Sequence, residues 1–205
     1  MNAARAINHH ADHPGFSGVT GVLCGLAFLL VGRAKARLAA DTAHISSADH
    51  VVDVGCGPGT AARVAARRGA RVTGVDPAST LLRIGRLVTP RRMPITWSEG
   101  TAEHLPVPDG SATVVWALAT VHHWQDVAMA VAEAHRVLIP GGRLIAIERQ
   151  SADDATGLAS HGWTRQQAES FGMLCRDAGF SDVCVAAQGK GRDAVWVVSG
   201  THPAL

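Results

Sequence analysis

Glycines and aspartates stand at a spacing that suits the binding of a nucleoside cofactor. An apolar run at residues 51–54 contains Asp53 and is followed by a loop in which every second residue is glycine. These glycines are Gly55, Gly57 and Gly59. Glycine adopts a positive φ readily and lets a ligand approach the backbone closely. Because helix-forming residues follow at 61–68, the loop is predicted to lie at a helix N-terminus, as in nucleotide-binding crevices.

A second aspartate follows at the interval expected for a ribose contact. Asp76 ends the apolar run 71–75, about twenty residues beyond the glycine loop, where a carboxylate can accept hydrogen bonds from both ribose hydroxyls. The alternative is that Asp76, which precedes Pro77, caps the next helix. Because the loop and the acid occur together at this interval, we favour the ribose contact, with Pro77 beside the same ligand.

Two cofactor classes compete for this loop. A dinucleotide requires G-x-G-x-x-G/A, which fails when read from Gly55 and fits when read from Gly57. In that second register the turn begins late, and Asp53 lies close to the expected phosphates. A carboxylate there favours a cationic ligand such as S-adenosylmethionine, which carries an ammonium and a sulfonium but no phosphate. Both cofactors contain a ribose, so Asp76 does not separate them.

The composition is that of an ordinary folded chain with little net charge. A length of 205 residues, with 47% hydrophobic and 18% charged residues, is enough for one domain with a sizeable core. A net charge of +2 does not favour nucleic acid as a partner, and we interpret the two arginine clusters as exposed helix faces. The four cysteines lack zinc-ligand spacing, so we expect free thiols, a cytoplasmic protein and no metal site.

Strand and helix patterns alternate after residue 49. Strands are expected at 51–54, 71–75, 95–98, 113–118, 143–147, 183–186 and 194–198, and helices at 61–68, 79–88, 126–138 and 163–178. Pro140-Gly141-Gly142 predicts a turn before the fifth strand, and Gly189–Arg192 predicts a hairpin between the last two. The alternation predicts an α/β fold, a parallel sheet with helices on both faces and one antiparallel strand.

Residues 1–48 are predicted to form an N-terminal helical segment, separate from a ligand-binding domain at 49–205. The apolar stretch 18–31 has helical spacing but is shorter than the roughly 20 residues that span a bilayer. We expect it to pack on the domain as a candidate lid over the ligand, with peripheral membrane contact as the minority interpretation. Residues 1–14 contain three histidines and are expected to form a frayed terminus.

Further short motifs follow one another along the chain. They are Glu99-Gly100-Thr101-Ala102-Glu103-His104-Leu105-Pro106, Pro108-Asp109-Gly110-Ser111, Ala119-Thr120-Val121-His122-His123-Trp124 and Arg136-Val137-Leu138-Ile139-Pro140-Gly141-Gly142. With the glycine loop and Val75-Asp76-Pro77, they resemble class I S-adenosylmethionine-dependent methyltransferases, nearest to the small-molecule enzymes of quinone biosynthesis. The resemblance implies a Rossmann-like seven-stranded sheet, mostly parallel with an antiparallel last strand. It also implies methyl transfer that leaves S-adenosylhomocysteine as product.

The resemblance also implies the cofactor contacts, position by position. It places Asp53, Gly55, Cys56 and Gly57 around the methionine moiety, Asp76 and Pro77 at the ribose, Thr101, Ala102 and Glu103 beside the adenine, and Ala117 and Leu118 below the methionine moiety. Many relatives carry an aspartate at the position of Thr101. The contact to the adenine amino group would therefore come from a hydroxyl here.

His122 and His123 are the candidate catalytic residues. They follow the fourth strand, where the resemblance places groups that face the methyl acceptor, and an imidazole can remove a proton from a weakly acidic nucleophile. The alternative is a structural role in the loop before Trp124, favoured slightly for His123 and even for His122. His161 and Trp163 are further candidates to line the acceptor pocket, with His104 and Glu148 as weaker ones.

The acceptor is predicted to be a small lipophilic molecule. Few residues separate the fifth strand from Trp163, so no large capping domain is inserted, and the apolar stretch 18–31 is the main candidate cover. The sequence Ala117–Thr120 replaces the Asp/Asn-Pro-Pro-Tyr/Phe motif of amine methylases that act on DNA or glutamine. A non-catalytic S-adenosylmethionine-binding protein and a nicotinamide-dependent oxidoreductase stay open as alternatives, as do the accepting atom and the oligomeric state.

Overall fold

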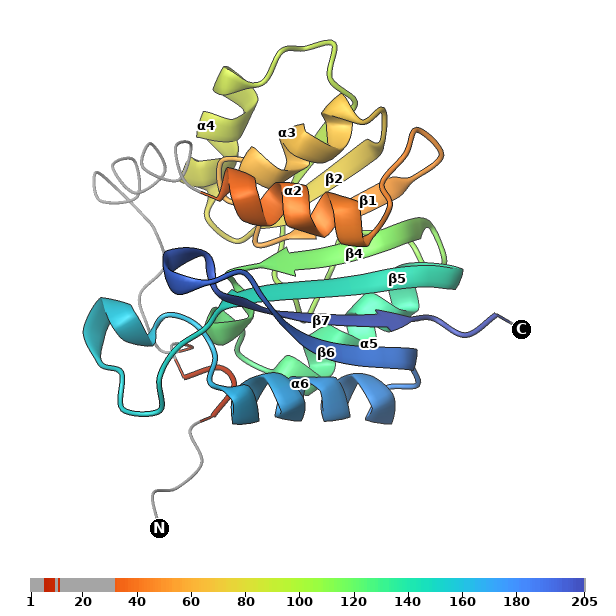
Figure 1. Cartoon of the computed structure of the whole chain (residues 1–205). Coiled ribbons are helices and arrows are strands. Elements are labelled where there is room, and N and C mark those ends of the chain that lie inside the picture. The colour runs from red at the N-terminus through yellow and green to blue at the C-terminus, as the bar shows by residue number, and fades with distance from the viewer. Residues whose placement is uncertain (1–5, 10, 12–31, 205) are drawn as a thin grey trace.

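The computed structural model describes residues 6–9, 11 and 32–204 (Figure 1). Within these residues, seven strands form one sheet in the order β3-β2-β1-β4-β5-β7-β6. The strands are β1 (His50–Val54), β2 (Arg71–Asp76), β3 (Ile95–Glu99), β4 (Ala112–Leu118), β5 (Leu138–Arg149), β6 (Ser181–Gln188) and β7 (Val195–Thr201). The helices are α2 (Arg33–Thr42), α3 (Thr60–Arg67), α4 (Ser79–Val88), α5 (Val127–Val137) and α6 (Arg165–Asp177), with single 3₁₀ turns η1 (Val121–His123), η2 (Gly157–Ser160) and η3 (Gly191–Asp193).

The sheet is parallel except at β7. Strand β1 pairs in parallel with both β2 and β4, and β4 pairs in parallel with β5. Strand β7 runs antiparallel between β5 and β6, joined to β6 by the predicted hairpin. The predicted seven-stranded Rossmann-like fold is therefore confirmed, and the carboxyl ends of β1, β2, β4 and β5 meet at one edge.

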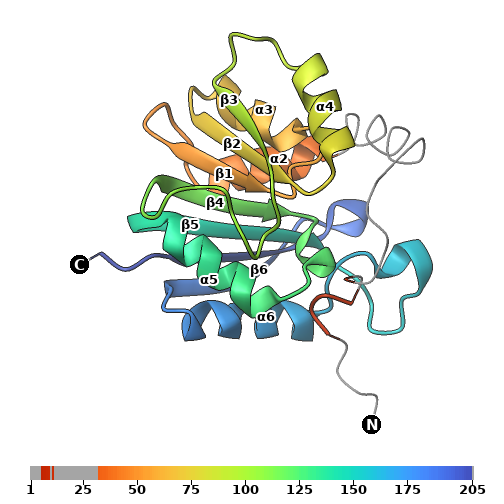
Figure 2. The same ribbon diagram turned by 180° about the vertical axis from the view of Figure 1, so that it is seen from behind.

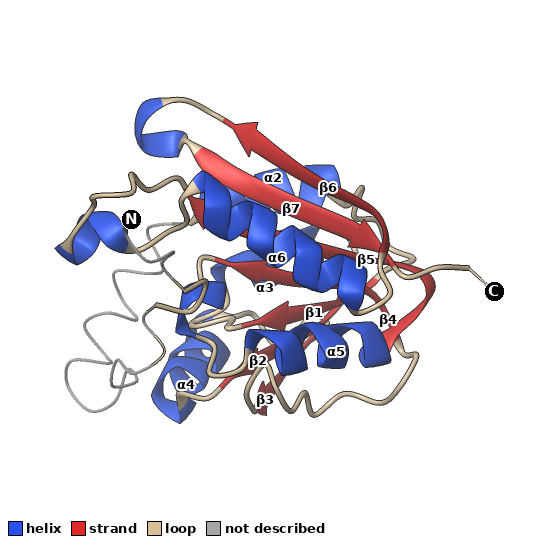
Figure 3. Cartoon of the chain, turned by 90° about the horizontal axis from the view of Figure 1, so that it is seen from below, coloured by secondary structure: helices blue, strands red, loops and turns tan. Residues whose placement is uncertain are grey.

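Helices cover both faces of the sheet. Helices α2, α3 and α4 lie on one face and α5 and α6 on the other (Figures 1 and 2), and the view from below in Figure 3 shows α5 and α6 side by side. The alternation of β1 explains the two cores, because Val51 packs toward α2 and α3 whereas Val52 and Val54 pack in the cluster that holds α5 and α6. Asp53 shares the face of Val51, so the strand turns a carboxylate toward α3.

Side-chain caps fix where two of the helices begin. Asp126 Oδ1 accepts a hydrogen bond from the Met129 N–H and starts α5. Thr164 and Gln167 form a reciprocal capping box at the start of α6. These caps hold the loops that precede both helices, and one of those loops carries η1.

The Pro-Gly-Gly motif was misread as a turn before the fifth strand. Residues 140–142 instead lie inside β5, where the register with β4 shifts between Ala112 and Val114. Gly141 donates to the His202 carbonyl, and the His202 N–H donates to the Gly142 carbonyl, so the C-terminal segment stabilises the irregularity. Proline cannot donate to the ladder, which is why it is found at such a bulge.

The N-terminal part of the chain is joined to the domain. Helix α2 packs the small side chains of Ala36, Ala39 and Ala40 against α3 and the sheet. The apolar stretch 18–31, the predicted lid, lies outside the described residues. No helix in the described part of the chain is long and apolar enough to cross a membrane. The division at residue 48 stays a prediction.

Residues 6–9 and 11 do not form a frayed terminus, contrary to the prediction. Asn8 Nδ2 donates to the carbonyls of Trp124 and Gln125 at 3.0 and 2.9 Å. Gln167 Nε2 donates to the Ala6 carbonyl at 2.6 Å, and Trp163 Nε1 donates to the Ile7 carbonyl at 3.3 Å. This short segment therefore lies between η1 and the start of α6.

Candidate active site

The loop after β1 has the predicted left-handed glycines. Gly55, Gly57 and Gly59 have φ angles of +66°, +52° and +78°, and α3 begins at the next residue. A Cβ on Gly55 would lie 2.1 Å from Thr120 Oγ1, so this glycine is required by contact with the loop after β4. A Cβ on Gly57 would meet no atom within 4 Å. Gly57 thus borders unfilled space that a ligand can enter.

Asp76 ties the glycine loop to the end of β2. Its Oδ2 accepts a hydrogen bond from the Gly57 N–H, and its Oδ1 accepts one from the Ala78 N–H, both at 2.8 Å. Burial raises the pKa of this carboxyl, opposed by the two N–H groups. Each oxygen retains a second lone pair. The carboxylate can therefore hold the loop and still accept hydrogen bonds from a ribose.

Asp53, in the strand that precedes the glycine loop, has a buried side chain with an oxygen that is unsatisfied within the described part of the chain. It is 2% exposed, and its Oδ2 has no hydrogen-bond partner among the described residues. Burial, with the nearby charge of Asp76, raises its pKa to about 7. A buried acceptor of this kind carries a desolvation cost that a cationic or hydrogen-bond-donating ligand group offsets. The residues of the loop therefore fit a ligand with such a group, as S-adenosylmethionine has.

The predicted adenine contacts form a turn beside β3. Thr101 is exposed, whereas Ala102 and Glu103 are buried. The Glu103 carboxylate accepts hydrogen bonds from the N–H groups of Gln125 and Asp126, at 2.8 and 3.2 Å. Glu103 thus links this turn to the start of α5, in addition to any contact with a ligand.

The chain bends sharply after β4 and carries both candidate histidines. Ala117 at the end of the strand is buried and Leu118 half-buried, and the next residue, Ala119, has a φ of +57°. A non-glycine residue in this region costs free energy, and such strain gathers at functional sites. The bend leads directly into η1, where His122 is 3% exposed and His123 half-buried.

Glu148, at the end of β5, holds His122. Its Oε2 lies 3.0 Å from His122 Nδ1, and its Oε1 accepts the Val121 N–H at 2.9 Å. Although burial opposes ionisation, the charge and hydrogen bond of His122, the charge of Lys35 and the Val121 N–H lower the pKa of Glu148. An ionised carboxylate only accepts hydrogen bonds, so His122 Nδ1 donates to it.

Other histidines gather around this pair. The His161 ring lies 5.5 Å from that of His122 and 5.8 Å from that of His123, and the His9 ring stacks 6.0 Å from that of His122. His161 thus lies beside η1, next to His122 and His123. Trp163, the other candidate of this segment, is fully buried, and its ring lies 4.9 Å from that of Phe171.

Sequence reasoning undervalued Glu148 and misjudged His9. The available signal for Glu148 was a single acid directly after the apolar strand residues 144–147, at the edge where ligands bind. No local pattern could have found His9, because its neighbours come from η1, η2 and α6. The pairing depends on the tertiary fold.

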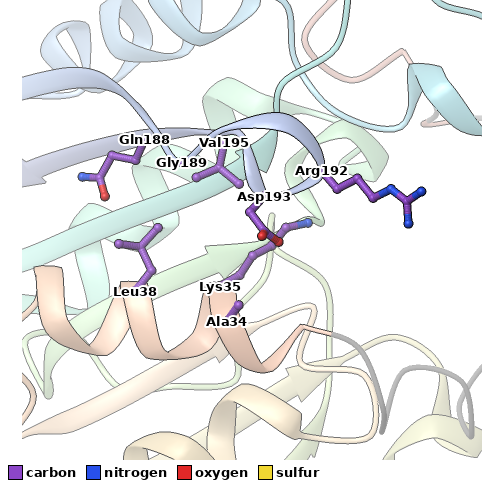
Figure 4. Close-up of a pocket in the computed structure, with 8 residues that line it drawn as sticks. All are labelled: Ala34, Lys35, Leu38, Gln188, Gly189, Arg192, Asp193 and Val195. Carbon is purple, nitrogen blue, oxygen red and sulfur yellow. The ribbon is translucent and has the colours of Figure 1, made fainter.

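A surface pocket lies on the α2 side of the same edge. Figure 4 shows Lys35 of α2 and Asp193 of η3 among its lining residues, and no predicted cofactor residue lines it. Burial lowers the pKa of Lys35, opposed by the charge of Glu148. Lys35 therefore acts on Glu148 from the α2 side.

Comparisons with known proteins agree with this geometry. Residues 52–146 match the family model described as a methyltransferase domain. Over 112 residues the chain is 35% identical to a demethylmenaquinone methyltransferase of Tropheryma whipplei, which covers 55% of this chain and 46% of that protein. The chain spans about half the length of the curated relatives it matches.

Solved structures share the fold at low sequence identity. The [4+2]-cyclase SpnF has a TM-score of 0.73 at 17% identity and covers 84% of this chain and 81% of its own. Geranyl diphosphate C-methyltransferase from Streptomyces coelicolor, solved with S-adenosyl-L-homocysteine, has a TM-score of 0.67 at 17% identity and covers 82% and 75%. Residues 52–146 thus match a methyltransferase domain, and the order of the motifs and the sheet topology agree with that match.

Proposed function

We propose that this protein transfers the methyl group of S-adenosylmethionine to a small lipophilic acceptor and releases S-adenosylhomocysteine. The observation that carries the proposal is the junction of two loops at one sheet edge. The glycine loop touches the loop after β4 at Gly55 and Thr120, and the latter loop carries His122 on Glu148. A cofactor crevice and a proton acceptor thus adjoin.

The cofactor would be held by groups from four strand ends. They are Asp53, Gly55, Cys56, Gly57, Asp76, Pro77, Thr101, Ala102, Glu103, Ala117 and Leu118. Asp53 offers its buried Oδ2 to the ammonium, Asp76 accepts the ribose hydroxyls, and Gly57 leaves the space that the methionine moiety needs. Bound S-adenosylmethionine supplies an electrophilic methyl carbon on a positively charged sulfur.

The protein's own groups orient the acceptor and remove its proton. In-line transfer depends mainly on positioning, which can supply about 7–11 kcal/mol. His122 Nε2 takes the proton of a weakly acidic nucleophile, and Glu148 holds the ring through Nδ1 and stabilises the imidazolium that results. His123 and His161 line the same side.

The lipophilic character of the acceptor is inferred from two sources. The relatives and neighbours include proteins named for demethylmenaquinone and for geranyl diphosphate. The apolar stretch 18–31 is proposed to cover the acceptor, so Leu26→Ala and Leu30→Ala should weaken acceptor use while leaving cofactor affinity intact. Unchanged acceptor kinetics in both variants would contradict the proposal that residues 18–31 cover the acceptor.

Thermal unfolding with S-adenosylmethionine, S-adenosylhomocysteine and NAD tests the cofactor. A ligand at one hundred times its Kd stabilises by about 2.7 kcal/mol, which at roughly 2–4 °C per kcal/mol gives a clear rise in Tm. We expect a shift with the two adenosyl compounds that is lost in Asp76→Ala and kept in the exposed control Asp41→Ala. A shift with NAD alone would contradict the proposal and favour the oxidoreductase.

Turnover separates the enzyme from a non-catalytic binding protein. Radiolabelled S-adenosylmethionine and reduced demethylmenaquinone are expected to give a methylated, lipid-extractable product. Cofactor binding without methyl transfer to this or other quinols would favour the non-catalytic alternative.

A further inference from the structure

Three histidines converge at the edge of the candidate site from separate parts of the chain. His122 and His123 belong to η1, and His161 follows η2. One ring nitrogen from each lies within 4.8 Å of the other two. The rings of His122 and His123 are 4.2 Å apart, and His161 meets His122 edge-on at 87°. The three imidazoles therefore surround one small volume.

Glu148 gives this cluster an orienting partner. Its carboxylate lies at His122 Nδ1, so His122 Nε2 lies on the opposite side of the ring. Histidines that bind metals usually donate their other N–H to a carboxylate or carbonyl, which fixes the tautomer and raises the basicity of the ligating nitrogen. Glu148 is fully buried, and this arrangement is therefore held firmly.

The donor set selects the kind of ion. Three imidazoles without a thiolate suit Zn²⁺ and its first-row neighbours, whereas Mg²⁺ and Ca²⁺ require oxygen ligands. A Zn–N distance of about 2.0–2.1 Å in tetrahedral geometry puts ligating nitrogens roughly 3.3 Å apart, so nitrogens that lie within 4.8 Å of one another must approach by up to about 1.5 Å. His123 and His161 are half-buried on short loops, where such a movement is least restricted.

We propose that His122, His123 and His161 bind a divalent transition-metal ion, Zn²⁺ in the first instance, with Glu148 as the residue that positions His122. The three-histidine set leaves a fourth position for water or a ligand oxygen, as in catalytic zinc sites. Metal binding of this kind does not depend on methyl transfer.

His9 is a neighbour of the ion and not a ligand. Its Nε2 lies 2.8 Å from the Ser160 carbonyl, and its Nδ1 lies 3.2 Å from the Ala6 carbonyl and 3.0 Å from Gln167 Nε2. These contacts involve both ring nitrogens, so we expect the His9 ring to border the site without binding the ion. His9 thus shields the site on one side.

The ion and the proton acceptor exclude each other at His122. An ion on Nε2 occupies the nitrogen that would otherwise take a proton. With the ion bound, an acceptor hydroxyl at the fourth position would ionise at lower pH and release its proton to water, because a bound cation stabilises the oxyanion. The metal state of the protein would thus decide how the acceptor is activated.

Titration of the untagged, chelator-treated 205-residue chain with ZnCl₂ by calorimetry tests the site. We expect one ion per chain at micromolar or lower Zn²⁺. His123→Gln and His161→Gln should each weaken binding by more than about 100-fold, since even changes to positioning residues cost about 10–100-fold. Glu148→Gln should weaken it by about 10–100-fold. Metal-free thermal unfolding of each variant checks that it folds.

Other histidines of the chain provide matched controls. His135 and His202 form a pair 4.0 Å apart at a distance from the site, so His202→Gln should leave Zn²⁺ affinity unchanged. His10→Gln combined with His13→Gln tests the N-terminal histidines, and it should also have no effect. The proposal is overturned if the native protein binds no Zn²⁺ in the micromolar range. It is also overturned if His161→Gln binds normally or if the His10/His13 variant loses the ion.

Discussion

Two buried carboxyls at the same edge of the sheet, on strands separated by β4, behave in opposite ways. Asp53 on β1 has an oxygen with no hydrogen-bond partner among the described residues, and burial raises its pKa to about 7. Glu148 on β5 is also fully buried, yet the charge and hydrogen bond of His122 outweigh burial and lower its pKa. Both are surrounded by apolar strands, so the partner and not the depth of burial decides ionisation.

The difference corresponds to two tasks. Among the described residues, one oxygen of Asp53 lacks a hydrogen-bond donor, which a cofactor could supply, although the Trp116 side chain and the Ala62 N–H partly oppose the rise in its pKa. Glu148 already has its donors, which favour its ionised form, and it holds a histidine ring. The carboxyl on the glycine-loop side thus has an oxygen that a ligand could satisfy, whereas both oxygens of the Glu148 carboxylate already have partners within the protein.

The largest expected effect is on the histidine side. His122→Asn should reduce methyl transfer to reduced demethylmenaquinone by about 10²- to 10⁴-fold, because general base catalysis contributes that much. Binding of S-adenosylhomocysteine should be unchanged, since His122 is not among the proposed cofactor contacts. Initial rates at saturating cofactor measure the effect, with His202→Asn as control. An unchanged rate in the His122→Asn variant would contradict the assignment of proton removal to the histidine side.

Asp53→Asn should stabilise the ligand-free protein at high pH. A carboxyl whose pKa is raised from 3.8 to about 7 contributes stability that is present below about pH 4 and lost as pH rises through 7. The amide removes this loss, so the gain at pH 8 is at most about 4 kcal/mol and vanishes toward pH 4. Urea unfolding at pH 4 and pH 8 measures it. An equal gain at both pH values would contradict the raised pKa.

Two glycines of one loop should respond differently to alanine. Gly55→Ala forces a Cβ against Thr120 and should destabilise the ligand-free protein by about 1–3 kcal/mol. Gly57→Ala meets no atom, so backbone strain alone should cost about 1–2 kcal/mol. Gly57→Ala should in addition lose the thermal shift with S-adenosylhomocysteine. If it kept the full shift, Gly57 would not border the cofactor.

Asn8→Ala should have the smallest effect. It removes hydrogen bonds to the carbonyls of Trp124 and Gln125, each worth about 0.5–1.5 kcal/mol when buried and less here, where one is exposed. Thermal unfolding compared with Asn2→Ala, the chain's other asparagine, measures it. A change in cofactor affinity would contradict the proposal that Asn8 makes no contact with the cofactor.

The features that could be predicted from the sequence are those formed by residues close together in the chain. The glycine loop, Asp76 and the strand patterns lie within single βαβ units, where spacing alone determines position. The His122–Glu148 pair joins residues 26 apart, and His9 and His161 join it through loops with no periodic signal. Helix α2 falls within the predicted N-terminal helical segment 1–48, but its bounds were not predicted, because its buried face is made of alanines, which give little hydrophobic contrast. Pro140 was interpreted as part of a turn, although a bulge accommodates it within β5.

The docking of residues 6–9 and 11 bears on how the protein should be produced. This segment lies against η1 and Ser160, whereas β7 ends at Thr201 beside Arg143, at the opposite edge of the sheet (Figure 1). A polyhistidine affinity tag fused to the N-terminus would bring foreign imidazoles toward the histidine cluster. The same tag at the C-terminus would be carried away from it. Protein intended for metal or acceptor measurements is therefore best purified with a C-terminal, cleavable tag.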